Sequence, residues 1–183
     1  MSVALPVAPV AVRPLARTTS AVMAQFFAIA TIAATIDLMT KELATGLLGH
    51  GQLVALTNKI GFLLVYNTGT AGGLSIGPFT TAINVLVTIV AIVMVVRVVS
   101  PLARVDARAV QPLALLTGGA LGNLASMIAG PEGVADFLAV RLPNTALMVM
   151  NVADLMLWSG AALLVPVVVR LCSAIRAERR ARA

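Results

Sequence analysis

Four long apolar stretches set the pattern of the chain, at residues 21–39, 79–99, 110–128 and 151–169. Each has about 19 to 21 residues, and at about 1.5 Å of rise per helical residue this length crosses a hydrocarbon layer about 30 Å thick. The second stretch is the most uniform, because from 79 to 96 it holds no charged residue and Asn84 is its one strongly polar residue. The pattern predicts four transmembrane helices in a single membrane domain.

The segment between the first two helices has an order of its own. Residues 59–66 form a β-prone run of aliphatic and aromatic residues, which ends at the turn-forming sequence NTG at 67–69. We therefore expect an all-α integral membrane protein with a small β-rich region in its outer loops.

The composition agrees with a lipid environment. Of 183 residues, 60% are hydrophobic and 11% are charged, whereas soluble domains carry about 25% charged residues. The single cysteine, Cys172, excludes an internal disulfide and thiolate metal sites. The lone His50 has no second histidine or cysteine nearby, so we expect no metal site.

Basic residues are unevenly divided between the two ends of the predicted bundle. Ten lie on one side and three on the other: Arg13, Arg17, Arg97, Arg104, Arg108, Arg170, Arg176, Arg179, Arg180 and Arg182, against Lys41, Lys59 and Arg141. By the positive-inside rule, both termini and the 100–109 loop are cytoplasmic, and the 41–78 and 129–150 loops face outward.

This orientation predicts a cytoplasmic leader at 1–20, a membrane domain at 21–171 and a basic cytoplasmic tail at 172–183. The tail is suited to anionic lipid headgroups rather than to nucleic acid. A cleavable secretory signal is the alternative for the N-terminus, since Arg13 and Arg17 precede an apolar run. Cleavage there would remove part of the helix that supplies Asp37, and the charge pattern fits four helices better than three.

Ionisable residues at membrane depth cost at least about 2.5 kcal/mol each, so those that persist are candidates for function. Asp37, Thr40 and Lys41 fall on one face near the outer end of the first helix. The structural alternative is an ion pair at the helix end with the lysine extended toward water. A proton-coupled carrier using Asp37 and Asp154 is a further alternative.

Two other acids converge on the outer membrane surface. Asp136 lies in the second outer loop and Asp154 lies one turn into the fourth helix. Two carboxyl groups that share a site do not both ionise, so one keeps a proton while the other accepts one. Such a pair can activate water and protonate a leaving amine, as in an aspartic protease. Alternatively, Asp136 solvates a loop and Asp154 caps a helix.

Five motifs, in order along the chain, carry a resemblance. They are DLMTK at 37–41, NTGTAGG at 67–73, GGALGNL at 118–124, GVADF at 133–137 and NVAD at 151–154. The chain resembles the bacterial lipoprotein signal peptidase family, also called signal peptidase II, over all four predicted helices.

The resemblance implies an intramembrane aspartic endopeptidase of the bacterial inner membrane. It would cut a diacylglyceryl-modified prolipoprotein just before the lipidated cysteine, with membrane lipid and prolipoproteins as partners, no nucleic acid and no cofactor. The resemblance implies Asp136 and Asp154 as the catalytic pair. It assigns supporting or substrate-binding roles to six further residues: Asp37, Lys41, Asn67, Gly69, Asn123 and Asn151.

The chain departs from the family pattern in the third helix. After Gly-Asn-Leu the family usually has an apolar residue followed by Asp-Arg, whereas this chain has Ala125, Ser126 and Met127. Losing both charges avoids a buried unpaired one, so we expect the fold to survive. Gly72 and Met150 also replace aromatic residues of the family. A non-catalytic paralogue that binds lipoproteins or lipid is therefore a second interpretation.

Overall fold

Four long helices and one small sheet make up the computed structural model, which describes residues 18–68, 77–130, 132–143 and 146–182. The helices are α1 (Thr19–Leu47), α2 (Thr80–Val105), α3 (Val110–Ala129) and α4 (Val152–Arg182), with short 3₁₀ turns η1 (Gly77–Phe79) and η2 (Ala107–Ala109). All four α-helices are long and apolar enough to cross a membrane, as the sequence predicts.

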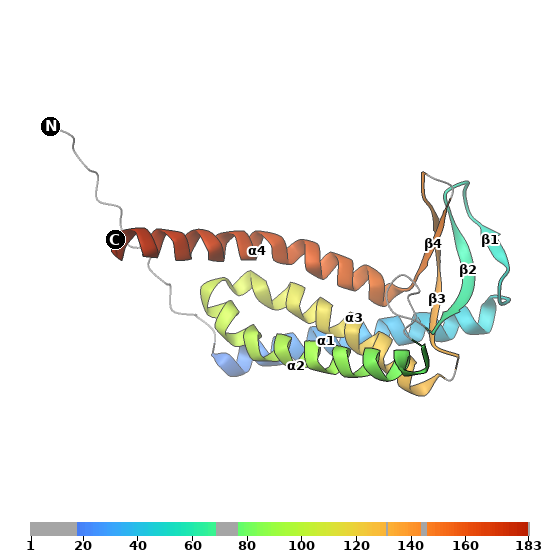
Figure 1. The fold of residues 1–183 in the computed structure, drawn as a ribbon, viewed down its shortest axis with the longest axis horizontal. Helices are drawn as coiled ribbons and strands as arrows, with labels where there is room; N and C mark the ends of the chain where they lie inside the picture. The colour runs from blue at the N-terminus through green and yellow to red at the C-terminus, as the bar shows by residue number, and fades with distance from the viewer. Residues whose placement is uncertain (1–17, 69–76, 131, 144–145, 183) are drawn as a thin grey trace.

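The helices lie side by side, and the sheet stands across one end of the bundle (Figure 1). The start of α1, the connection from α2 to α3 and the end of α4 all lie at the opposite end. This arrangement brings the two predicted outer loops together at the sheet. Most of the expected leader, residues 1–17, falls outside the described residues.

The helices extend beyond the apolar stretches that predicted them. α1 continues past residue 39 to Leu47, and α4 continues past residue 169 to Arg182. The length of an apolar stretch indicates only the part of a helix that lies in lipid, because the backbone hydrogen bonds of the helix can continue into the polar layer. The basic segment expected as a tail at 172–183 is therefore, through Arg182, a continuation of α4.

Glycines allow α3 to pack tightly between α1 and α4. A Cβ at Gly118 would lie 2.7 Å from the carbonyl oxygen of Ala30 in α1, and a Cβ at Gly119 would lie 2.6 Å from that of Ala153 in α4. Small residues at such positions let membrane helices approach closely, which maximises van der Waals contact where lipid supplies no hydrophobic driving force. The glycine-rich stretch of α3 thus holds the three helices close together.

Both outer loops contribute to one antiparallel sheet. Its strands are β1 (Leu53–Ala55), β2 (Ile60–Asn67), β3 (Val134–Arg141) and β4 (Leu147–Met150), in the order β1-β2-β3-β4. β2 confirms the β-prone run expected at 59–66. Asp136 lies in the second outer segment as expected, but within it the residue belongs to β3, where it pairs with Val65 of β2.

The two faces of the sheet have different neighbours. Leu64 and Phe137 pack with Ala44 in a small core beside the end of α1. Because side chains alternate along a strand, Asn67, Val134 and Asp136 are presented on the other face. That face of the sheet closes the end of the groove between α2 and α4.

Candidate active site

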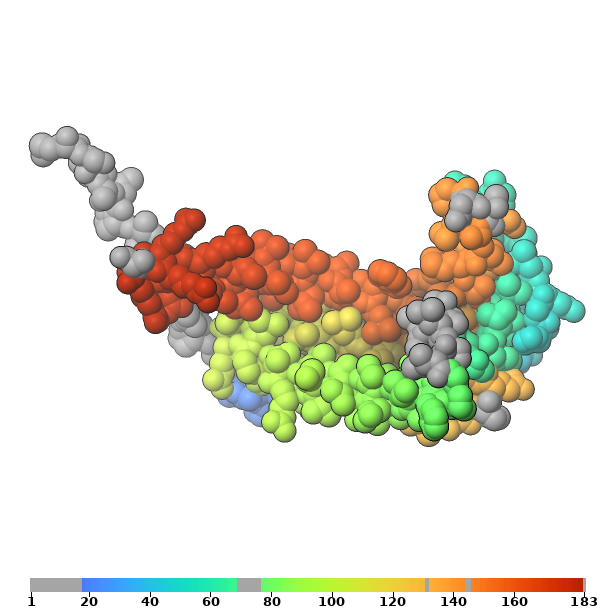
Figure 2. Space-filling view, in the orientation of Figure 1, coloured from blue at the N-terminus to red at the C-terminus, as the bar shows by residue number. Residues whose placement is uncertain are grey.

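A cleft of about 330 Å³ lies between α2, α3 and α4 and ends at the sheet. In Figure 2, α3 is visible in yellow between α2 in green and α4 in red, where the surface is hollowed. Among the described residues that line it, the two aspartates are the titratable ones. The lining comprises Asn67, Asn84, Val87, Thr88, Ala91, Ala120, Asn123, Met127, Val134, Asp136, Asn151, Asp154 and Leu157.

Asp154 is held by the start of its own helix. The backbone N–H of Asn151 donates to Oδ2 of Asp154 at 3.0 Å, and the backbone N–H of Asp154 donates to Oδ1 of Asn151 at 3.0 Å. This reciprocal pair is a capping box, with Asn151 just before the helix and Asp154 at its third residue. The helix-capping interpretation of Asp154 is therefore correct for its backbone contacts, and the same residue also faces the cleft.

Asn151 connects the two aspartates. Its Oδ1 accepts the N–H of Asp154, so its amide nitrogen points the other way and donates to Oδ1 of Asp136 at 2.6 Å. The side chain of Asn151 is fully buried, which leaves it no alternative arrangement in water. One amide thus fixes the position of Asp136 relative to Asp154.

Asp136 is buried, with 6% of its surface exposed, so the loop-solvating interpretation is wrong. Burial raises the pKa of Asp136 from 3.8 to about 6, because the charged carboxylate loses its hydration. Hydrogen bonds from the Asn151 and Asn67 side chains and the charge of Lys41 oppose this rise, while the negative charge of Asp154 adds to it. The negative charge of Asp154 therefore favours the protonated form of Asp136.

A buried polar chain reaches Asp154 from α1. Lys41 Nζ donates to Oδ2 of Asp37 at 2.7 Å and to Oδ1 of Asn123 at 2.7 Å. Since a lysine can only donate, it fixes the orientation of the Asn123 amide. The amide nitrogen of Asn123 then donates to Oδ1 of Asp154 at 3.1 Å. Lys41 thus positions the catalytic candidate through Asn123.

Asp37 also holds α4 from a different helix. Its Oδ1 accepts the backbone N–H of Ala153, in the first turn of α4, at 2.8 Å. Asp37 is fully buried and Lys41 is 5% exposed, so the pair is present but the lysine does not extend to water as the structural alternative supposed. The room for Asp37 comes from Gly122, where a Cβ would overlap Oδ2 of the carboxylate.

The remaining predicted residues are distributed as follows. Asn67 lies at the end of β2 and lines the cleft. Gly69 lies outside the described residues. His50 stacks on Tyr66 at 5.7 Å between ring centroids and does not line the cleft. Within the described ranges, no group of three or more acidic, histidine or cysteine side chains is arranged to hold a metal ion.

Sequence reasoning did not assign Asn84, Met127 or the N–H of Ala153 to the site. Asn84 was detectable as the strongly polar residue in an apolar span, which is itself a signal of function. The role of Ala153 depends on contact between α1 and α4, for which no local signal exists. Ser126, next to Met127, donates its hydroxyl to the carbonyl oxygen of Gly122 at 3.0 Å and does not line the cleft.

The sequence of the chain is similar to those of known membrane proteases. Residues 29–170 match the sequence model of signal peptidase II. A lipoprotein signal peptidase of Chlorobium phaeobacteroides is 30% identical over 149 residues, which cover 76% of this chain and 87% of the relative. That of Mycobacterium tuberculosis is 33% identical over 146 residues, which cover 75% and 67%.

Two solved structures of bacterial membrane enzymes share the fold. They superpose with TM-scores of 0.71 and 0.70, at 21% and 22% identity. The alignments cover 81% and 80% of this chain and 89% and 93% of the solved chains. With the match over 29–170, these comparisons show that the chain belongs to the signal peptidase II family of lipoprotein-processing proteases, which are multi-pass proteins of the cell membrane.

Proposed function

We propose that the chain is an intramembrane aspartic endopeptidase that removes signal peptides from diacylglyceryl-modified prolipoproteins by cutting before the lipidated cysteine. The observation that carries the proposal is the pair of carboxyl groups in one cleft, joined through the buried amide of Asn151. Asp136 comes from the sheet and Asp154 from α4, so the two carboxyl groups approach a peptide bond in the cleft from different elements.

The surroundings of the two carboxyl groups suggest how they divide the reaction. The raised pKa of Asp136 makes it the member that holds the shared proton. Asp154, which accepts two N–H bonds, takes a proton from water as the oxygen of that water attacks the scissile carbonyl carbon. Asp136 gives its proton to the carbonyl oxygen. As the tetrahedral intermediate collapses, one hydroxyl proton returns to Asp136, the C–N bond breaks, and the amine leaves with the proton that Asp154 had taken.

The supporting residues act by position. Lys41 and Asn123 orient Asp154, and Asp37 fixes the start of α4. Because both ends of the Asn123 amide are already hydrogen-bonded, we assign it to positioning rather than to the intermediate. Asn67 lines the cleft and its side chain hydrogen-bonds to Asp136, so we assign it a contact with the substrate backbone beside that carboxyl group.

The topology suits a lipid-anchored substrate. We place both termini in the cytoplasm and the sheet at the outer surface, with the membrane domain at 21–171, because the arginines of the α2–α3 connection and of the end of α4 lie away from the sheet. The scissile bond of a substrate anchored by its acyl chains lies at the outer surface, where the two aspartates lie. The end of α4 then contacts anionic headgroups of the inner leaflet, and no nucleic acid is a partner.

The test is a gel-shift cleavage assay with purified protein and a diacylglyceryl-modified prolipoprotein. We expect the parent to cleave and Asp136→Asn and Asp154→Asn each to abolish cleavage. Asp106→Asn is the matched control, since Asp106 lies at the opposite end of the bundle, bonded to Arg170. The control is expected to cleave like the parent.

The two alternatives give different results in the same preparation. If the parent is folded but leaves a confirmed lipidated substrate uncut, it is a non-catalytic paralogue. The basis for this alternative is that Ser126 and Met127 stand where the family usually has an Asp-Arg pair. A proton-coupled carrier instead shows substrate flux into proteoliposomes that depends on a proton gradient. Cleavage by either aspartate variant at the parental rate would refute the proposed catalytic pair.

A further inference from the structure

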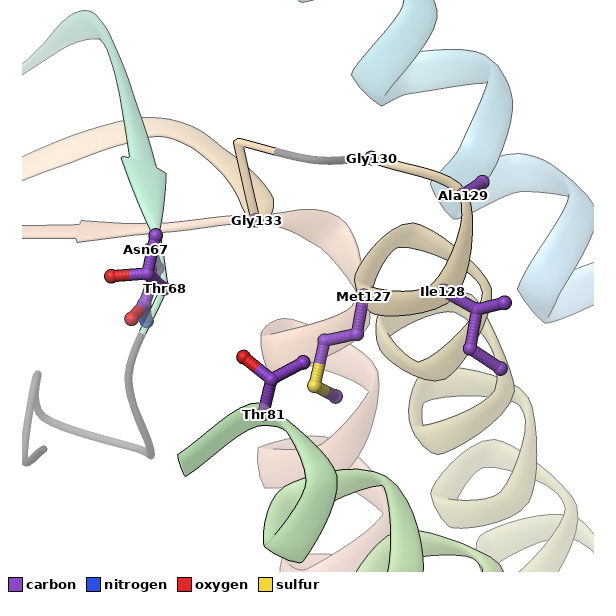
Figure 3. Close-up of a pocket in the computed structure, with 8 residues that line it drawn as sticks. All are labelled: Asn67, Thr68, Thr81, Met127, Ile128, Ala129, Gly130 and Gly133. Atoms are coloured by element: carbon purple, nitrogen blue, oxygen red, sulfur yellow. The ribbon is translucent and has the colours of Figure 1, made fainter. Parts of the chain in front are cut away.

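A second cavity, of about 340 Å³, adjoins the catalytic cleft (Figure 3). It lies between the end of β2, the first turn of α2, the end of α3 and the turn that leads into β3. It is lined by Asn67, Thr68, Thr81, Met127, Ile128, Ala129, Gly130 and Gly133. Its volume falls at the lower end of the range for small-molecule sites, about 300 to 1,000 Å³.

The cavity and the cleft lie next to each other and share part of their lining. Asn67 and Met127 line both. A chain whose scissile bond lies at the two aspartates advances about 3.3 Å per extended residue, so it enters the second cavity within a few residues. The cavity is therefore a place for a residue that flanks the scissile bond.

The direction of the substrate decides which flanking residue this is. From Asn84 to Ala91 along α2, the cleft runs away from the sheet between membrane-spanning helices, where the apolar signal peptide belongs. Thr81, in the first turn of α2, lies on the sheet side of these residues, and so does the end of α3. The chain after the lipidated cysteine leaves toward this side.

The walls of the cavity define what fits. None of the described residues that line it carries a charge. Asn67, Thr68 and Thr81 offer hydroxyl and amide groups on one side, and Met127 projects from α3 toward Thr81 on the other (Figure 3). A charged side chain placed here loses hydration without gaining a partner of opposite charge, which is unfavourable. Methionine is unbranched and adapts to uncharged groups of different shape.

We propose that this cavity is the subsite for the residue that follows the lipidated cysteine, and that Met127 makes it selective for an uncharged side chain. The inference rests on the proposed function, since it assigns a part of the same substrate. It makes Met127 a specificity-determining residue and gives Asn67 a contact with the substrate on each side of the scissile bond.

The test measures kcat/KM for lipidated substrates with Ser, Leu, Asp or Arg after the cysteine. We expect the parent to prefer Ser and Leu over Asp and Arg by at least about tenfold, which is about 1.4 kcal/mol. Met127→Arg is expected to raise kcat/KM for the Asp substrate at least tenfold relative to that for the Leu substrate, and to lower kcat/KM for the Arg substrate further. Met127→Leu keeps the parental preference. Met148→Arg, which adds the same charge on the exposed face of β4, is the matched control and also keeps it.

A second measurement separates this inference from the proposed function. Asp136→Asn protein is irradiated with a lipidated substrate that carries a diazirine side chain directly after the cysteine. We expect label on peptides containing Met127 or Thr81, and none there when the diazirine lies two residues before the cysteine. Equal cleavage of all four substrates without this label overturns the subsite while the peptidase stands. If the parent cleaves none of the substrates, the proposed function fails. The labelling experiment then decides the subsite by itself: label at Met127 supports it, and no label at Met127 overturns it.

Discussion

Replacing Gly122 by alanine is expected to displace Asp37 and, with it, the polar network of the site. A Cβ at position 122 would overlap Oδ2 of Asp37 and lie 3.0 Å from its Cγ and 3.1 Å from its Cβ. Asp37 has little room to move, because it is fully buried and both of its carboxylate oxygens accept hydrogen bonds, from Lys41 and from the N–H of Ala153.

The size of the effect follows from three contributions. Each hydrogen bond to a charged group contributes about 1.5 to 3 kcal/mol, and overpacking costs about 1 to 3 kcal/mol. Alanine in a helix offsets about 1 kcal/mol of this through its higher helix propensity. With one of the two bonds to Asp37 lost, Gly122→Ala should lower the free energy of unfolding by about 1.5 to 5 kcal/mol.

Gly46→Ala is the matched control for this prediction. Gly46 also lies in a membrane helix, but a Cβ there meets nothing within 4 Å. We expect it to be neutral or stabilising by up to about 1 kcal/mol. Unfolding of both variants is measured in detergent micelles by circular dichroism with increasing denaturant. Equal stability of the two variants would refute the packing argument, and so would a Gly122→Ala penalty that persists unchanged when Asp37 is also replaced by alanine.

Three further perturbations address the site directly. Because the folded-state pKa of Asp136 is raised to about 6 from 3.8, its contribution to stability is fully present below pH 3.8 and is lost as pH rises through 6. At about 1.4 kcal/mol per pH unit, the loss is about 3 kcal/mol. Thermal unfolding measured against pH should therefore show a decline in stability that Asp136→Asn lacks, and a parallel decline in the variant contradicts the assignment. Lys41→Met leaves Asp37 buried without its cation and should cost about 3 to 5 kcal/mol, as measured by denaturant unfolding, with partial recovery when Asp37→Asn is added; no recovery would argue against an unpaired charge. Asn151→Ala releases both carboxyl groups and should lower kcat about 100-fold with little change in KM, and an unchanged kcat in the cleavage assay would show that the amide does not set their geometry.

The four helices were predictable because lipid imposes a simple pattern. Every backbone group in the membrane must be hydrogen-bonded within the protein, so a long apolar run is a helix. β3 gave no comparable signal. It is buried on both faces, between the core beside α1 and the catalytic cleft, and such a strand does not alternate apolar with polar residues. Its partner β2 is also distant in the sequence, so no turn sequence between the two strands indicates that they pair.

The residues of the site were predictable by type, while their connections were not. Asp37 and Lys41 are recognisable as a pair because they are one helical turn apart. The continuation to Asn123 spans 82 positions and depends on how α1 packs against α3. Likewise, the sequence places Ser126 and Met127 next to each other without showing that the serine turns back to its own helix while the methionine lines the cleft.

The Asp37–Lys41 ion pair has a consequence for how the protein enters the membrane. α1 is synthesised long before Asn123 and the start of α4, so both charges meet the translocon without these partners. A charged residue costs about 2.5 to 3.5 kcal/mol to insert at the centre of a nascent helix, which is an upper bound for this pair near the outer end of α1. Lys41 reaches Asp37 within one turn of the same helix, so α1 carries its own counter-ion. We therefore expect α1 to insert with the two charges paired. We expect Asp37→Ala to impair insertion of α1 in a glycosylation-mapping assay more than the double change with Lys41→Ala; the reverse order would contradict this. The contact that later positions the site would thus first serve the biogenesis of the chain.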